Sequence, residues 1–260
     1  YISSADSYFY RRIGVPDGAK YMKVTILEES YPTDLSVQYF MVPTHCSFKN
    51  IKFENNRCVG LAQSAMKDML VENCEFTNCG QSSAKCAYDA EDGWDMMQDV
   101  TFRKLNFHDN PNNDFLTCAG HNFVIEDMID GKVHFWERTN SYVVRNCNNL
   151  SSAYLGHTSR KRSGYVRFCN NTINGNINIE AAQENDTCLL TVKDCNIYGR
   201  AENTIDTGLY LRCNIGKSNI TDNNWNISLG SGNFKDCTIS NKSGENMGGI
   251  YENCTFENIS

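Results

Sequence analysis

The chain has 260 residues, with 24 Lys and Arg against 31 Asp and Glu, and therefore a formal net charge of -7. Its only run of three basic residues is Arg160-Lys161-Arg162, which is too short for binding along a phosphate backbone, so we expect no nucleic-acid partner. No apolar run has the roughly 20 residues that a membrane-spanning helix needs, and no signal-peptide pattern opens the sequence.

The first 45 residues form a segment of their own. Residues 21–27 and 35–42 are apolar and rich in β-branched and aromatic residues, which predicts two strands, and the turn-forming residues 29–34 separate them. We expect residues 1–45 to cover the open end of the structure that follows, because an uncovered strand edge would pair with other chains. Since Tyr1 is not a natural first residue, we also expect chain before it, and either more chain or another subunit beyond Ser260.

Residues 46–260 carry a repeat. Clear copies are FKNIKF (48–53), VENCEF (71–76), FRKLNF (102–107), VRNCNN (144–149), VKDCNI (192–197), GKSNI (216–220), FKDCTI (234–239) and YENCTF (251–256), with weaker copies at 125–130 and 166–171. One register position holds Ile51, Cys74, Leu105, Met128, Cys147, Cys169, Cys195, Ser218, Cys237 and Cys254. Nine steps cover the 203 residues from Ile51 to Cys254, about 22.6 residues per step. Helical repeats need roughly 33 to 47 residues, so this period predicts an all-β solenoid, a right-handed parallel β-helix of about ten coils.

The cysteines fit a packed column better than disulfides. The sequence has 13 of them, an odd number, and six occupy the register position that Ile, Leu and Met fill in other coils. We expect these thiols to be reduced and to point inward as small buried hydrophobic groups. No Cys or His spacing matches a zinc site, so a metal–thiolate centre is not expected.

The longest coil, 31 residues from Cys74 to Leu105, contains the densest acidic stretch of the chain, AYDAEDGWDMMQD at 87–99. Extra residues in a solenoid form loops on one face, and that face is often the binding face. Asp89, Glu91 and Asp92 are the candidate catalytic carboxylates. With Asp95, they are also the candidate oxygen ligands for Ca²⁺, and the alternative is that no cofactor is bound. A simple acidic turn at Asp92-Gly93 is the competing interpretation.

A second strand in each coil is expected at 58–61, 88–91, 114–118, 133–137, 153–157, 177–180 and 226–229. Because side chains alternate along a strand, equivalent positions should line one face of the sheet. The predicted face combines carboxylates with aromatic and polar side chains, as carbohydrate sites do. Its candidate substrate-binding residues are Trp94, His134, Trp136, Tyr154, His157 and Glu180, with Asn178 in the same register. Burial of Trp136 between coils, and a solvated loop around His157, are the competing interpretations.

The Asn turns and stacked Cys or Ile positions of residues 46–260 resemble those of the pectate-lyase-type right-handed parallel β-helices. More narrowly, YDAEDGWDMMQDVTFRKLNF at 88–107 is similar to β-helix segments in the tail spikes and tail fibres of phages and phage-tail-like particles of Gram-positive bacteria. That resemblance implies a virion or tail-particle appendage that binds bacterial surface polysaccharide, often as a homotrimer, and in some members cleaves it. A secreted protein is the alternative.

Enzymes of this superfamily have further fingerprints. The pectin hydrolases show Gly-His-Gly, of which this chain has only Gly120-His121. Calcium-dependent lyases need a Lys or Arg base, for which Arg103 and Lys104 are the nearest candidates. A glycosidase needs two carboxylates about 5 or 6.5–9.5 Å apart. Asp89 and Glu91, two apart on a strand, would have Cα atoms about 7 Å apart, which permits this role without being diagnostic of it. Two hypotheses therefore stay open: a polysaccharide-binding appendage, and a polysaccharide lyase or glycoside hydrolase acting on an acidic polysaccharide.

Overall fold

A computed structural model describes residues 43–81, 85–90, 97–118, 120–135, 140–155, 163–175, 177–179, 189–198, 201–203, 208–216, 232–242 and 248–259, together with Gly18 and Lys20. The chain divides into two compact units, Tyr1–Met41 and Val42–Ser260. The strands expected at 21–27 and 35–42, and the capping role expected of residues 1–45, lie outside the described residues.

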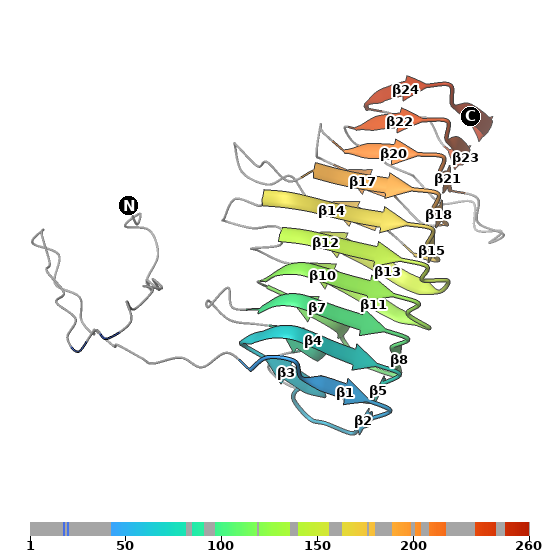
Figure 1. Ribbon diagram of the computed structural model, residues 1–260. Coiled ribbons are helices and arrows are strands. Elements are labelled where there is room, and N and C mark those ends of the chain that lie inside the picture. Colours follow the sequence, from blue (N-terminus) through green and yellow to red (C-terminus); the bar gives the residue numbers. More distant parts are fainter. Residues whose placement is uncertain are drawn as a thin grey trace, which may run out of the picture. The chain divides into compact units, whose positions relative to one another are not determined.

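The second unit is a right-handed parallel β-helix, as the repeat predicts. Its described strands form three sheets in which every neighbouring pair is parallel, and Figure 1 shows the strands of the first sheet stacked in chain order. Sheet A consists of β1 (Ser47–Lys49), β4 (Met66–Glu72), β7 (Met97–Arg103), β10 (His121–Glu126), β12 (Asn140–Arg145), β14 (Ser163–Cys169), β17 (Leu189–Lys193), β20 (Leu209–Leu211), β22 (Asn233–Lys235) and β24 (Ile250–Glu252). Sheet B consists of β2 (Lys52–Glu54), β5 (Glu75–Thr77) and β8 (Asn106–His108).

Sheet C is the longest and carries the second strand of each coil. Its members are β3 (Leu61–Gln63), β6 (Cys86–Ala90), β9 (Asn113–Thr117), β11 (Gly131–Phe135), β13 (Leu150–Leu155), β15 (Thr172–Ile173), β16 (Ile177–Ile179), β18 (Asn196–Ile197), β19 (Ala201–Asn203), β21 (Asn214–Ile215), β23 (Thr238–Lys242) and β25 (Thr255–Ile259). Five of the expected second strands overlap these bounds closely, whereas β3 begins where the expected strand 58–61 ends. The strand expected at 226–229 lies outside the described residues.

A left-handed corner ends each strand of sheet A and explains the Asn or Asp of the repeat. Ten corner residues have φ between 51° and 57°, a conformation that Asn and Asp tolerate better than most residues. They are Asn50, Asn73, Lys104, Asp127, Asn146, Asn170, Asp194, Arg212, Asp236 and Asn253. Stacked corner amides also bond to one another, since Asn73 Nδ2 donates to Asn50 Oδ1 at 2.7 Å. The corner therefore fixes where each coil turns.

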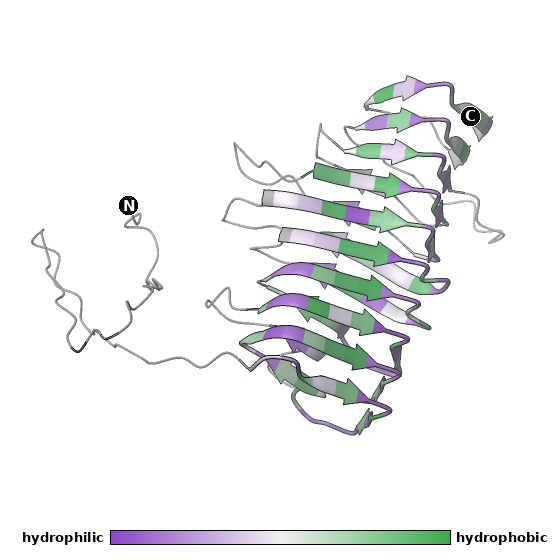
Figure 2. Ribbon diagram, in the orientation of Figure 1, coloured by the Kyte–Doolittle hydropathy of each residue, from purple (hydrophilic) through white to green (hydrophobic). Residues whose placement is uncertain are grey.

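The core consists of columns of identical or similar side chains from successive coils. Phe53, Phe76 and Phe107 stack with ring centroids 4.7 and 4.6 Å apart, which matches the spacing of neighbouring strands. Tyr210 and Phe234 stack in the same way at 4.7 Å near the other end. Figure 2 shows hydrophobic residues within the strands of sheet A and hydrophilic residues at the corners that follow them.

The column after the corner holds six of the twelve described cysteines, and none of the twelve forms a disulfide bond. The sequence-based prediction is wrong for two members of this column. Cys169 is the last residue of β14, pairs in register with Arg145 and Lys193, and is only half-buried. Cys213, which is buried behind the corner residue Arg212, occupies the coil that was assigned to Ser218, a residue outside the described range.

Asn171 occupies the place in the column expected for Cys169. It follows the corner residue Asn170 and is 2% exposed. Its side chain satisfies two buried backbone groups of the preceding coil: Cys147 N donates to Oδ1 at 2.9 Å, and Nδ2 donates to Val144 O at 2.9 Å. A polar residue therefore fits this column because both of its hydrogen-bonding groups are paired.

Candidate functional site

Five side chains on the outer face of sheet C lie in one line across neighbouring strands. Cross-strand register pairs Asp89 with Leu116, Leu116 with His134, His134 with Tyr154, and Tyr154 with Asn178. We call these five residues the outer column. Their strand neighbours on both sides, such as Tyr88, Phe115, Val133 and Phe135, are buried in the core, so alternation directs the outer column away from it. At about 4.8 Å per strand the column extends roughly 19 Å along the solenoid.

An aromatic pair forms the centre of the outer column. The rings of His134 and Tyr154 are 4.4 Å apart between centroids and 88° apart in plane, an edge-to-face contact. Both residues are half-buried. Each ring restricts the other, because parallel neighbours on one sheet face pack directly and edge-to-face geometry is favourable. The alignment of His134, Tyr154 and Asn178 on one line agrees with the expectation from the sequence.

The Asp89 end of the column is more enclosed. Asp89 is 5% exposed and Leu116 is 6% exposed, although both point away from the core. Leu116 packs with Cys86 and Cys118 in a small hydrophobic cluster separate from the main core. The repeat pattern does not predict Leu116 between Asp89 and His134, because it relates these two residues across two coils. An acidic group at this end is therefore held in a largely water-excluded place beside apolar side chains.

Seven of the other candidate residues lie outside the described residues, and their roles stay predictions. They are Glu91, Asp92, Trp94, Asp95, Trp136, His157 and Glu180. Of the four carboxylates considered for Ca²⁺, the structure describes only Asp89. Within the described ranges no group of three or more Asp, Glu, His or Cys side chains is arranged to hold a metal ion.

His121 lies on sheet A and not on sheet C. It begins β10 of sheet A, where it pairs in register with Gln98 and Asn140. The Gly120-His121 pair is therefore on a different sheet from the outer column, and the two cannot form one site through strand register.

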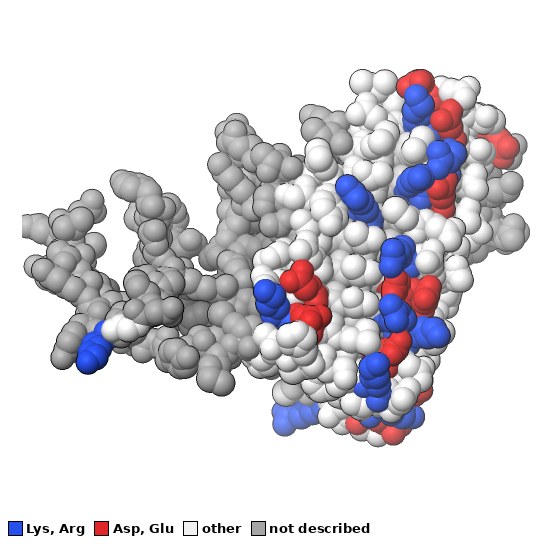
Figure 3. All heavy atoms as spheres, in the orientation of Figure 1, with Lys and Arg blue, Asp and Glu red and all other residues white. Residues whose placement is uncertain are grey.

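Sequence reasoning missed a row of alternating charges on the outer face of sheet A, which Figure 3 shows as a band of blue and red. Arg103 Nε lies 2.6 Å from Glu126 Oε1, and Arg145 Nε lies 2.8 Å from Glu126 Oε2. Burial alone would raise the pKa of Glu126, but the hydrogen bonds from Arg145 and Arg103 outweigh it and lower the pKa. The signal was present in the sequence, because these residues each stand just before the corner residue.

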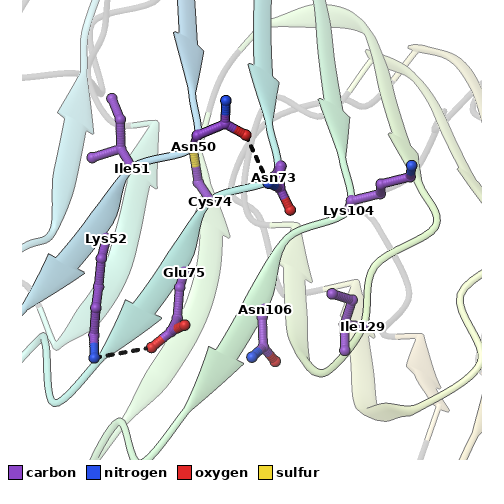
Figure 4. A pocket seen from close by; sticks show the side chains of 9 residues that line it. All are labelled: Asn50, Ile51, Lys52, Asn73, Cys74, Glu75, Lys104, Asn106 and Ile129. Carbon is purple, nitrogen blue, oxygen red and sulfur yellow. Dashed lines mark hydrogen bonds and ion pairs between the residues drawn. The ribbon is translucent and has the colours of Figure 1, made fainter.

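A hollow of 290 Å³ lies where sheet A meets sheet B, and Figure 4 shows its lining. The corner residues Asn50, Asn73 and Lys104 form one side. The other side consists of Lys52, Glu75 and Asn106, whose side chains point outward from β2, β5 and β8. Ile129, which is 54% exposed, lies at the edge. No motif in the sequence pointed to this hollow, because its two sides come from different registers of the repeat.

Comparison with protein-family models, with curated proteins and with solved structures found no match. Among the described residues, no helix is long and apolar enough to cross a membrane. The conclusions about function therefore depend on the chain's own residues.

Proposed function

We propose that this chain is the carbohydrate-binding β-helix of a phage-type tail appendage, and that it recognises bacterial surface polysaccharide through the outer face of sheet C. The observation that carries the proposal is the edge-to-face pair of His134 and Tyr154, aligned with Asp89 and Asn178 in one outward column.

The chemistry of the outer column suits a sugar chain. Aromatic rings pack against the C–H faces of sugars, while carboxylate, amide and phenol groups bond to hydroxyls. Tyr154 and His134 offer the first kind of contact, and the half-buried Asn178 offers the second, with the enclosed Asp89 at the end of the same column. Because the column is built on paired strands, its spacing is fixed before a ligand binds, and less conformational entropy is lost on binding.

The assignment to a tail appendage is supported by the parallel β-helix and by the resemblance of residues 88–107 to tail-spike and tail-fibre segments. The homotrimer that this resemblance implies is part of the same proposal.

Binding of purified capsular and cell-wall glycans tests the proposal. We expect the Tyr154→Ala protein to bind its glycan roughly tenfold more weakly than the native protein, because one ring contact is lost. Thr191→Ala is the matched control, since Thr191 is half-buried on the outer face of β17 in sheet A. Equal binding by the native and Tyr154→Ala proteins would exclude the outer column as the binding surface.

Depolymerisation of an acidic polysaccharide is the second candidate function. It is favoured by Asp89, a carboxylate that is 5% exposed and lies in the same column as the aromatic pair. Catalytic carboxylates often occupy such enclosed places, because their proton affinity is adjusted there. Incubation with the same glycans, followed for new reducing ends and 4,5-unsaturated products, separates this candidate from binding alone.

A further inference from the structure

The hollow between sheets A and B contains polar groups that the protein leaves available. Glu75 is already engaged, because Lys52 Nζ and His108 Nε2 lie 3.2 and 3.3 Å from its Oε1. Asn73 Nδ2 is bonded to Asn50 Oδ1. By contrast, the side chains of Lys104 and Asn106 make no hydrogen bond or ion pair with any residue in the described part of the chain.

Lys104 is also in an unusual backbone conformation for its type. It has φ of 53° at a corner where eight of the ten coils place Asn or Asp. The other exception, Arg212, compensates through two hydrogen bonds to Asp194, at 2.7 and 2.9 Å. Lys104 has no such compensation among the described residues, and it interrupts the amide ladder that Asn50 and Asn73 begin. The Lys104 backbone N–H donates to Glu126 O at 3.1 Å, as at the other corners, but its side chain has no partner among the described residues and is therefore available to a ligand.

We infer that this hollow binds one anionic sugar residue, with the acidic group at Lys104 Nζ and ring hydroxyls at Asn106 and the exposed amide atoms of Asn73. Lys52 does not offer a second free cation, because it also pairs with Glu54 at 3.1 Å. The apolar edge formed by Ile129 suits the C–H face of a sugar ring. A volume of 290 Å³ is just below the range for small-molecule sites, about 300–1,000 Å³, so it suits a single sugar residue rather than a long chain.

The acidic group could be a carboxylate, as in a uronic acid, or a phosphate ester. Both accept charge-assisted hydrogen bonds from an ammonium group. The site is independent of the outer column, since it is formed by sheets A and B rather than by sheet C.

Calorimetric titration of the full chain tests the inference, with galacturonate and glucose 6-phosphate as the acidic probes. Galactose, which lacks an acidic group, and acetate, which lacks hydroxyls, are the control ligands. We expect saturable binding of at least one acidic sugar at millimolar concentration and weaker binding of both control ligands. Lys104→Asn should reduce the affinity for the acidic sugar roughly tenfold, as expected for loss of one charged hydrogen bond.

Two variants make the result specific. Lys132→Asn removes one positive charge from an exposed position on β11 and should leave binding unchanged. Lys104→Asn should melt at the same temperature as the native protein or higher, because Asn suits the corner and extends the amide ladder. The inference is overturned if neither acidic sugar binds, if galactose or acetate binds equally well, or if Lys104→Asn binds the acid like the native protein.

Discussion

The carboxylate of Glu126 on β10 accepts a hydrogen bond at 2.6 Å from Nε of Arg103 on β7, one coil earlier. The next coil supplies a second arginine, Arg145, whose Nε and Nη2 lie 2.8 and 2.5 Å from the other oxygen. The Glu126 side chain is 8% exposed, against 40% and 49% for the two arginines. One carboxylate therefore links three successive coils.

Glu126→Gln should destabilise the protein by about 1–3 kcal/mol, because two arginines would remain beside each other without a shared negative charge. Glu252→Gln is the control. Its ion pair with Lys235 is 2.7 Å long, but the Glu252 side chain is 66% exposed, so we expect a loss below about 0.5 kcal/mol. Urea unfolding at neutral pH measures both changes, and equal midpoint shifts would contradict the role of the charge row.

The contribution of Glu126 to the free energy of unfolding should depend on pH. Its pKa in the folded protein is lowered from the ordinary value of 4.5, so its stabilising effect is present above that value and is lost as the pH falls through the folded pKa. The difference in unfolding free energy between native and Glu126→Gln proteins should therefore shrink below about pH 4. A difference that stays constant from neutral to acidic pH would show that ionisation of Glu126 does not contribute.

Asn171→Ala should lower the free energy of unfolding by about 2–4 kcal/mol, because it leaves Cys147 N–H and Val144 C=O buried without their hydrogen bonds. The chain contains a second example of the same arrangement. Cys79 N donates to Asn110 Oδ1 at 2.9 Å, and Asn110 Nδ2 donates to Phe76 O at 3.1 Å, so Asn110→Ala should cost a similar amount.

Asn214→Ala is the matched control for these two variants, because the Asn214 amide is exposed and, among the described residues, bonds only to Asn196 Oδ1, at 2.8 Å. We expect a loss below about 1 kcal/mol for it. A loss at Asn171 no larger than the loss at Asn214 would be inconsistent with the buried pairing.

Thiol alkylation of the native protein should distinguish the cysteines by place. Cys58 is exposed and should react first, and the half-buried Cys169 should follow more slowly, because burial raises its pKa. Cys147 should stay protected, since burial raises its pKa to about 12. Mass spectrometry of the labelled peptides measures the order. Equal protection of Cys169 and Cys147 would contradict the outward position of Cys169 and would support the sequence-based prediction that it points inward.

If the chain cleaves its glycan, Asp89→Asn should abolish turnover and leave glycan binding largely intact, because the amide keeps the shape but not the charge. Asp127→Asn is the matched control, since Asp127 is a corner residue of sheet A where Asn is equally suitable. Release of reducing ends measures turnover, and an Asp89→Asn protein with full activity would remove Asp89 from the mechanism.

The sequence predicted the solenoid, its number of coils and most members of one inward column. The reason is that each coil must place equivalent residues above one another, so the packing rule appears as a period in the sequence. The left-handed corner adds a second local signal, since it favours Asn or Asp at one position in each repeat. The alignment of His134, Tyr154 and Asn178 follows from the same regularity.

Only the tertiary structure decided the register of the irregular coils and the environment of each side chain. In VRFCNN a shift of two residues preserves the alternation of inward and outward side chains, so the pattern alone cannot distinguish Cys169 from Asn171 as the inward residue. The φ of Asn170 decides between them, because the column begins after the corner. Contacts between coils decide three further features: the near-complete burial of Asp89, the position of Leu116 beside it and the hollow at Lys104. A single repeat unit contains no information about these contacts.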